Sequence, residues 1–215
     1  MFYFETYKNK KVLRSDYLKE IDHFFTTREG FDFLSLGTQR LIKPEQTHSD
    51  NVEIVNIKDE YPNTDGLIFS EKDLTLFLRF ADCTPIIFYN PKTKQCAITH
   101  AGWRGTAQKI AVKTVEKMDG NNSDIIAVIG PAIGKCCYEV SEDVKTKLLS
   151  TVKNTDNLYT NNNVDLKNIN AQQLKEIGVE KIDICPYCTS CNNDLFFSYR
   201  KENGTTERHY AVVST

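Results

Sequence analysis

Three short apolar runs that follow one another in the middle of the chain constrain the fold most. Each is rich in β-branched or aromatic residues and shorter than a typical helix: Leu74–Phe80, Ile86–Tyr89 and Gln95–Thr99. The second and third runs are separated by Asn90–Lys94, a turn sequence. We therefore predict three consecutive strands. Cys83 lies at the junction of the first two strands and His100 at the end of the third, so the two side chains are expected close together.

An amphipathic helix is predicted directly after Arg104. Apolar or small side chains recur there at helical spacing: Ala107, Ile110, Ala111, Thr114, Val115 and Met118. The pattern ends near Asp119-Gly120. Because the first N–H groups of a helix have no partner within the helix and attract anions, a site for a phosphate or another anion is predicted beside Arg104.

The rest of the chain predicts strands and helices in mixed order. Strands are expected in a hairpin within Phe2–Leu18 and then at Phe24–Arg28, Val52–Ile57, Leu67–Phe69, Asp124–Ile129 and Lys181–Ile184. Ser141 and Asp165 are predicted helix N-caps. Leu195–Arg200 and Glu207–Val213 predict a closing hairpin around Glu202–Thr205.

This order of elements indicates the fold class. Strands dominate the first third, strands and helices alternate in the middle, and no segment repeats with a period of about 20–50 residues. No composition shift marks a linker between domains. We expect an α/β (α+β) fold in a single domain spanning residues 1–215, with mixed β-sheets sandwiched by helices.

Charge and hydropathy argue against two classes of partner. With 27 basic and 29 acidic residues the formal net charge is −2, which provides no basic surface for nucleic acid. No apolar run reaches the length of about 18 residues that a membrane span needs. Met1–Glu5 has no basic segment followed by an apolar one, as a secretory signal would. We expect a cytoplasmic monomer that acts on small molecules, with its seven cysteines reduced.

Two of the four histidines, His48 and His100, lie at predicted strand ends, as Cys83 does. Two imidazoles and a thiolate suit Zn²⁺, and three protein ligands leave a fourth position open, as in catalytic zinc sites. A buried cysteine with hydrogen-bonded histidines is the more common arrangement of such residues. Spacing alone does not choose between these two interpretations.

A second group of cysteines forms two overlapping C-x-x-C pairs: Cys185, Cys188 and Cys191. Such pairs hold zinc or iron–sulfur clusters in other proteins, but no fourth ligand is evident nearby in the sequence. Structural or redox-sensitive thiols are the alternative. The adjacent Cys136 and Cys137 are predicted to point to opposite sides of the chain.

Three further residues are candidates for binding a substrate. Arg104 and Arg200 are potential anion ligands, with solvated surface charges as the alternative. Trp103, the only tryptophan, is either a core residue or the wall of a base-sized pocket. The loop Gly130–Gly134 either brings N–H groups close to a ligand or forms a tight turn.

Five motifs, taken in order, resemble the YfiH-like laccase-domain family, also called polyphenol oxidase family proteins. They are Gln46–Val52, Thr64–Leu67, Ala81–Pro85, His100–Gly105 and Gly130–Gly134. The most specific is His-Ala-Gly-Trp-Arg-Gly at His100–Gly105, and two tail segments, Cys188–Cys191 and Phe196–Arg200, are also similar. Phe31–Lys43 is shorter than the family's usual glycine-rich loop, and Thr206-Glu207-Arg208 replaces the usual Thr-Gly-Arg.

The resemblance implies a fold, a metal site and an activity. By motif position it assigns a catalytic zinc ion, with copper as the alternative metal, to His48, Cys83 and His100. It implies phosphorolysis of adenosine, inosine and methylthioadenosine to a base and a sugar 1-phosphate, together with deamination of adenosine. We expect Arg104, Arg200 and Trp103 to contact nucleoside and phosphate, and Asp82 to act as an acid or base.

Three other functions remain as alternatives. A copper phenol oxidase is the first, although the histidines contain no His-x-His pair of the kind that multicopper oxidases use. The resemblance also extends to members linked to the editing of peptidoglycan precursors by hydrolysis. A non-catalytic metal-binding module built on Cys185, Cys188 and Cys191 is the third.

Overall fold

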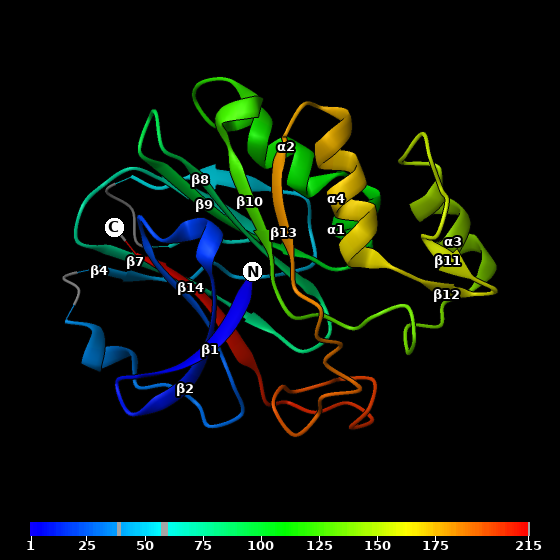
Figure 1. Ribbon diagram of the computed structural model, residues 1–215, viewed down its shortest axis with the longest axis horizontal. Helices are drawn as coiled ribbons and strands as arrows, with labels where there is room; N and C mark the ends of the chain where they lie inside the picture. The colour runs from blue at the N-terminus through cyan, green and yellow to red at the C-terminus, as the bar shows by residue number, and fades with distance from the viewer. Residues whose placement is uncertain (38–39, 57–59, 215) are drawn as a thin grey trace.

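The computed structural model describes residues 1–37, 40–56 and 60–214, and Figure 1 shows two β-sheets with the α-helices gathered on one side. The first sheet has the strand order β1-β2-β3-β14-β7-β4. In that order the strands span Phe2–Tyr7, Lys10–Ser15, Asp22–Thr26, His209–Ser214, Leu74–Phe80 and Arg40–Ile42. Neighbouring strands are antiparallel except β4 and β7, which are parallel. The last strand of the chain is therefore an interior strand of this sheet.

The second sheet contains two of the three predicted central strands. Its strand order is β13-β10-β8-β9-β6-β5. In that order the strands span Lys181–Ile184, Ile126–Ile129, Thr84–Asn90, Gln95–Ala101, Gly66–Phe69 and Val52–Ile54. The outer pairs β13/β10 and β5/β6 are parallel, and the inner pairs are antiparallel. The chain passes from the first sheet to the second between β7 and β8, at Cys83.

A shared apolar core lies between the two sheets. Alternate residues of β7, including Leu76 and Leu78, enter this core together with Ile87 of β8 and Ile98 of β9. Phe77, which lies between Leu76 and Leu78 in β7, belongs to a separate cluster on the other face of the first sheet. This alternation is the strand period of two. Each such buried side chain contributes about 1.5–3 kcal/mol.

The helices are α1 (Trp103–Ala107), α2 (Ile110–Lys117), α3 (Glu142–Leu149) and α4 (Leu166–Glu176). Helices α2 and α4 pack against β8 and β9 on the outer face of the second sheet. Helix α3 and the short pair β11 (Tyr159–Thr160) and β12 (Asn163–Val164) lie farther out (Figure 1). The predicted α/β class with mixed sheets is confirmed. Among the described residues, no helix has both the length and the apolar character that crossing a membrane requires.

The single helix predicted after Arg104 is divided into two. Lys109 adopts a left-handed conformation with φ 60° and separates α1 from α2. The apolar side chains of the predicted helix pack into two different hydrophobic clusters, which explains the break. Ile110 and Val115 pack on the second sheet, whereas Ala107 packs with Trp103 toward α3.

The closing hairpin predicted from Leu195–Arg200 and Glu207–Val213 is wrong. The second arm forms β14, but it pairs with β3 and β7, and the first arm consists of turns. Phe196 is fully buried, so its apolar run fills the core without forming a strand. Glu202 holds these turns by accepting a hydrogen bond from the Ser198 N–H at 3.0 Å.

Two smaller differences concern the first third of the chain. The segment Phe31–Pro44, for which the sequence predicts neither helix nor strand, contains a 3-10 helix at Phe33–Leu36 and the strand β4. The strand predicted at Val52–Ile57 ends at Ile54, and residue 57 lies outside the described residues. Strand β4 is only three residues long, which is why alternation of apolar residues did not reveal it.

Two buried histidines should make stability depend on pH. Burial lowers the pKa of His23 to about 4 and that of His209 to about 3, from an ordinary value of 6.5. The unfolded chain binds protons to these two residues more readily than the folded chain does. Their contribution to the free energy of unfolding is therefore fully present above pH 6.5 and is lost as the pH falls toward 4 and 3. Since one pKa unit corresponds to about 1.4 kcal/mol, the unfolding free energy should decrease by several kcal/mol.

Urea unfolding between pH 7.5 and 5 measures how steeply the free energy of unfolding changes with pH, in a range above that where most carboxylates titrate. His23 accepts a hydrogen bond from the Ser15 N–H at 3.0 Å, and glutamine keeps an acceptor there without a titrating group. His23→Gln should therefore flatten the slope. An unchanged slope in this variant would remove His23 from the explanation.

Candidate metal centre

His48 lies in the loop between β4 and β5, in a left-handed conformation with φ 62°. The carboxylate of Asp65 holds this loop by accepting hydrogen bonds from the N–H groups of Thr47 (3.1 Å), His48 (3.2 Å) and Ser49 (2.7 Å). The strained conformation at His48 is therefore fixed by several backbone contacts to one buried side chain. The predicted position of His48 at the start of a strand is corrected: three loop residues, Ser49–Asn51, separate it from β5.

His100 lies near the end of β9, as predicted, and is almost fully buried. Its Nδ1 atom is 2.7 Å from Oδ1 of Asp65. A carboxylate at Nδ1 leaves Nε2 of the ring for a metal ion. In the β8/β9 register Pro85 is opposite His100, which brings the histidine beside the β7–β8 junction where Cys83 lies.

The three predicted ligands meet at one point. The donor atoms of His48, Cys83 and His100 all lie within 4.8 Å of one another. The two imidazole rings are nearly perpendicular, with centroids 4.8 Å apart. Gly102 makes room for them, because a Cβ there would lie 3.0 Å from the sulfur of Cys83 and 3.2 Å from the ring of His48. The presence of glycine at this position of the His-Ala-Gly-Trp-Arg-Gly motif thus has a steric explanation: a side chain there would collide with two candidate ligands.

The charges of these residues are coupled. Burial by itself would raise the pKa of Cys83, but the neighbouring His100 and His48 lower it to about 6. Burial by itself would lower the pKa of His100, but the Cys83 thiolate and the Asp65 carboxylate raise it to about 9. Without a metal ion the pair is therefore a thiolate beside an imidazolium at neutral pH. A bound cation would replace the proton of His100.

The donor set fits a transition metal. Two imidazole nitrogens and one thiolate sulfur suit zinc, and copper binds the same ligand types with higher affinity. The carboxylate behind His100 supplies the outer-shell partner that metal-bound histidines usually have. His48 is exposed, so the group is accessible from one side.

That side opens into a cavity of about 610 Å³. Besides the three candidate ligands, its lining consists mainly of arginine, tyrosine and small polar side chains: Gln46, Arg79, Ala81, Asp82, Arg104, Tyr138, Tyr199, Arg200, Thr206 and Arg208. The size suits a small organic ligand, and the arginines suit an anion.

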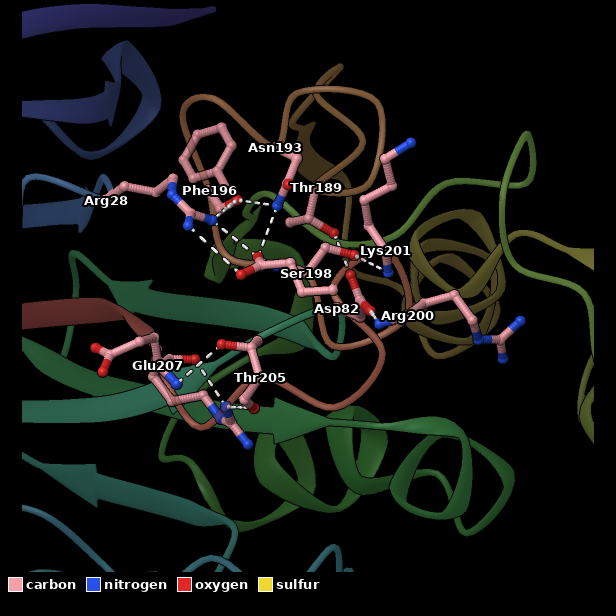
Figure 2. Close-up of polar contacts among 12 residues, drawn as sticks. Arg28, Asp82, Thr189, Asn193, Phe196, Ser198, Arg200, Lys201, Thr205 and Glu207 are labelled. Carbon is pink, nitrogen blue, oxygen red and sulfur yellow. Dashed lines mark hydrogen bonds and ion pairs between the residues drawn. The ribbon is translucent and has the colours of Figure 1, made fainter.

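Asp82 lines this cavity, and its carboxylate accepts two hydrogen bonds from the protein. Thr189 Oγ1 donates to Oδ1 at 2.6 Å and the N–H of Arg200 donates to Oδ2 at 2.7 Å. Figure 2 shows both groups converging on Asp82, while the guanidinium of Arg200 extends away from that carboxylate. Asp82 has φ 87°, an uncommon conformation for a residue other than glycine. Its contacts make it a positioning residue for the loop that carries Arg200.

The substrate-binding candidates are divided between two cavities. Arg104 and Arg200 line the cavity of the candidate metal site, as expected. Trp103 lies outside it and lines a neighbouring cavity of about 470 Å³, packed toward α3. The Arg104 guanidinium stacks on the indole ring, 4.6 Å from its centroid. The aromatic residues that line the cavity of the candidate metal site are instead Tyr138 and Tyr199.

Sequence reasoning missed Asp65 as a site residue. Burial alone would raise the pKa of Asp65, but hydrogen bonds from His100 and Ser49 lower it, so the side chain is a carboxylate. The Thr-Asp-Gly motif was recognised, yet only the pairing of β6 with β9 places it behind His100. The signal in the sequence was a carboxylate directly before a predicted strand, within a motif that the family resemblance had already identified.

Asp65→Asn should weaken metal binding by about 10–100-fold, the usual cost of losing an outer-shell partner. The amide keeps the shape of the side chain but loses the charge that favours the correct His100 orientation. Competition with a chelator measures the change in affinity. Asp22→Asn is the matched control, because its carboxylate pairs with Arg14 in the other sheet. Equal metal affinity in Asp65→Asn and Asp22→Asn would contradict this role.

The remaining cysteines form a different group from the one predicted. Cys185 is fully buried in the core between the sheets. Cys188 and Cys191 instead meet Cys136 and Cys137, with donor atoms within 4.8 Å of one another. The prediction that Cys136 and Cys137 point to opposite sides is wrong, since both sulfurs lie 3.5 Å from that of Cys191. A turn at Lys135–Cys137 aligns them.

Comparison with known proteins supports the resemblance read from the motifs. The family model described as multi-copper polyphenol oxidoreductase laccase matches residues 22–215. Purine nucleoside phosphorylase YlmD of Bacillus subtilis is 35% identical over 204 residues, covering 85% of this chain and 73% of that protein. Purine nucleoside phosphorylase YlmD of Geobacillus stearothermophilus is 36% identical over 204 residues, with 85% and 74% covered.

Solved structures show the same fold. The crystal structure of YlmD from Geobacillus stearothermophilus has a TM-score of 0.88 at 30% identity and covers 98% of both chains. A hypothetical protein YfiH from Bacillus licheniformis has a TM-score of 0.90 at 30% identity, also with 98% of both chains covered. On the family match, the identity to these relatives and the shared fold, this chain belongs to the multi-copper polyphenol oxidoreductase laccase family, the YfiH-like laccase-domain proteins.

Proposed function

We propose that this protein is a zinc-dependent purine nucleoside phosphorylase that also deaminates adenosine. In phosphorolysis an oxygen of phosphate forms a bond to C1′ of the sugar. The bond between C1′ and the purine nitrogen breaks, and its electrons leave with the base, which takes up a proton. Adenosine, inosine and methylthioadenosine are the proposed substrates. The names of the relatives support this reaction class.

One observation carries the proposal: three metal donors lie at the wall of a cavity that arginines and tyrosines also line. His48, Cys83 and His100 are the residues that would hold the metal ion. Zinc with three protein ligands supplies Lewis-acid activation of water or of a substrate oxygen. Asp65 orients His100 for this purpose. The donor types and the open side of the group support a catalytic site more than a closed structural one.

The arginines support binding of phosphate. Arg104 and Arg200 both line the cavity, and neither takes part in any ion pair among the described residues. Arg200 donates to the carbonyl oxygen of Glu139 at 2.9 Å and lies over the ring of Tyr138. A guanidinium with free N–H groups binds phosphate through parallel hydrogen bonds.

Tyr138 supports recognition of a purine. It lines the cavity, and its ring offers an apolar surface against which a flat base can stack. Burial raises the pKa of the Tyr138 hydroxyl, which therefore stays a neutral hydrogen-bond donor. Asp82 faces the same cavity, and an acid or base role for it stays a prediction beside its positioning role.

A copper-dependent phenol oxidase is the second candidate, because the same two imidazoles and thiolate also suit copper. The two candidates differ in their need for oxygen. Zinc-loaded, copper-free protein should convert adenosine to adenine in phosphate buffer without air, and to inosine without phosphate. If that protein converts no nucleoside while copper-loaded protein oxidises phenols with oxygen uptake, the oxidase is correct.

Arg104→Ala should raise the KM for phosphate by about 10-fold or more, since a hydrogen bond to a charged group contributes about 1.5–3 kcal/mol. Zinc content should not change, because Arg104 is not among the three candidate ligands. Arg104→Lys keeps the charge but not the paired donors, so its KM should lie between those of Arg104→Ala and the unaltered protein. Initial rates at varied phosphate measure both. An unaltered phosphate KM in Arg104→Ala removes Arg104 from phosphate binding.

A further inference from the structure

Four thiols outside the candidate active site lie together in the described part of the chain. They belong to Cys136, Cys137, Cys188 and Cys191, and their sulfur atoms all lie within 4.8 Å of one another. The sulfur of Cys191 is 3.5 Å from those of Cys136 and Cys137. All four are free cysteines. No step of the proposed reaction uses them.

The sheet topology brings the two pairs together. Cys136 and Cys137 follow β10, and Cys188 and Cys191 follow β13. These strands are parallel neighbours, so both following loops leave the same edge of the sheet. The pairing continues past the strands, because Ala132 forms a parallel bridge with Cys188 and its carbonyl oxygen accepts from the Thr189 N–H at 3.1 Å. Backbone hydrogen bonds therefore hold the two cysteine-bearing loops beside each other.

The surroundings of the sulfurs resemble those of a metal–thiolate site. The N–H of Gly134 donates to Cys188 Sγ at 3.2 Å, a contact that stabilises a thiolate. A Cβ at Gly134 would lie 3.3 Å from Cys136 Sγ and 3.2 Å from the Cβ of Cys188. Glycine at this position thus gives the sulfurs the room they need. Four thiolates this close repel one another unless a cation lies between them.

We propose that Cys136, Cys137, Cys188 and Cys191 bind one Zn²⁺ ion as a tetrahedral tetrathiolate site. Zn–S bonds of about 2.3 Å in a tetrahedron place sulfurs ~3.8 Å apart, which is compatible with two S–S distances of 3.5 Å and with all four sulfurs lying within 4.8 Å of one another. Four ligands fill the coordination shell, so the site is structural and has no open position. It does not depend on the proposed nucleoside activity.

The site would hold together the two loops that form one wall of the candidate active-site cavity. Tyr138 directly follows Cys137, and the loop that carries Cys188 continues to Thr189 and Arg200, which both bind Asp82. Zinc shared between the loops would fix Tyr138 relative to Arg200. Its removal should loosen this wall without removing any ligand of the candidate catalytic metal.

Metal analysis of protein purified under reducing conditions and loaded with zinc tests the proposal. The unaltered chain should hold two zinc ions, and Cys191→Ala and Cys83→Ala should each hold one less. The double variant should hold none. Cys185→Ala, which removes a buried cysteine of the same segment outside the cluster, should hold as much zinc as the unaltered chain. Zinc binding that disappears entirely in Cys83→Ala would overturn the site.

A titration that leaves the cluster intact covers the case in which Cys191→Ala does not fold. Cd²⁺ added to reduced Cys83→Ala protein should give sulfur-to-metal charge-transfer absorption that saturates at one ion per chain, with intensity typical of four thiolates. Bound Cd²⁺ should also protect four thiols from a thiol reagent. Absence of this absorption, or a disulfide between Cys191 and Cys136 or Cys137 under the same reducing conditions, would overturn the proposal.

Discussion

Cys83→Ala should remove most of the metal from the candidate active site and reduce nucleoside turnover by more than about 100-fold. Loss of an outer-shell partner already costs about 10–100-fold, and Cys83 is a direct ligand candidate and the only thiolate of the three. The loss of the sulfur leaves two imidazoles, which bind zinc too weakly to retain it through purification. Metal content and initial rates, measured on the same preparation, give the two numbers.

Cys96→Ala is the matched control for this substitution. Cys96 lies in β9, the strand that carries His100, and burial raises the pKa of its thiol to about 12, so it is not a thiolate. Cys96→Ala should therefore keep its metal and its activity even if it loses some stability. Circular dichroism shows whether each variant is folded. A folded, metal-free Cys83→Ala protein with full turnover would refute the metal centre.

Asp82→Ala should lower the free energy of unfolding by about 3 kcal/mol or more. Its carboxylate accepts from Thr189 and from the N–H of Arg200, and a hydrogen bond to a charged group contributes about 1.5–3 kcal/mol. Asp82 is buried, so water cannot replace both bonds. The loop that carries Arg200 would also move, and the KM for phosphate should rise. Urea unfolding and phosphate kinetics measure the two effects.

Asp82→Gly separates the side chain from the backbone at this position. The φ of 87° is strained for alanine but not for glycine, so Asp82→Gly should be about 1 kcal/mol more stable than Asp82→Ala. Both variants lose the carboxylate, so both should lose the contact to Arg200. If Asp82→Ala unfolds at the same urea concentration as the unaltered protein, the two hydrogen bonds do not stabilise the fold.

Much of the local structure could be predicted from the sequence. The run at Leu74–Phe80 and the two apolar runs after it form β7, β8 and β9, and the opening hairpin forms β1 and β2. Asp165 caps α4 by accepting from the Asn168 N–H at 3.1 Å. These features depend on residues only a few positions apart, whose periodicity and capping chemistry can be read directly.

Elements whose environment is set by distant residues were predicted less well. The stripe after Arg104 was identified, but the break at Lys109 depends on two clusters that only the folded chain separates. The run at Leu195–Arg200 is apolar enough for a strand, but β14, its predicted partner, already pairs with β3 on one side and with β7 on the other. Local propensity does not encode such competition.

For the candidate metal centre, the sequence determined which residue types were available and, through the family motifs, where the ligands lie. The strand pattern predicts that Cys83 and His100 lie close together, but only the tertiary structure shows that His48, from the loop between β4 and β5, meets them at the crossover between the sheets. It also placed Asp65 behind His100 through the pairing of β6 with β9.

For the thiol cluster, the tertiary structure decided still more than it did for the candidate metal centre. From the sequence, the tail cysteines lacked a fourth ligand and the adjacent pair at Cys136–Cys137 had no partner. About fifty residues separate the two pairs, and that spacing says nothing about their distance in space. The parallel pairing of β10 with β13 fixes it, because hydrogen bonds between the strands set where both following loops begin.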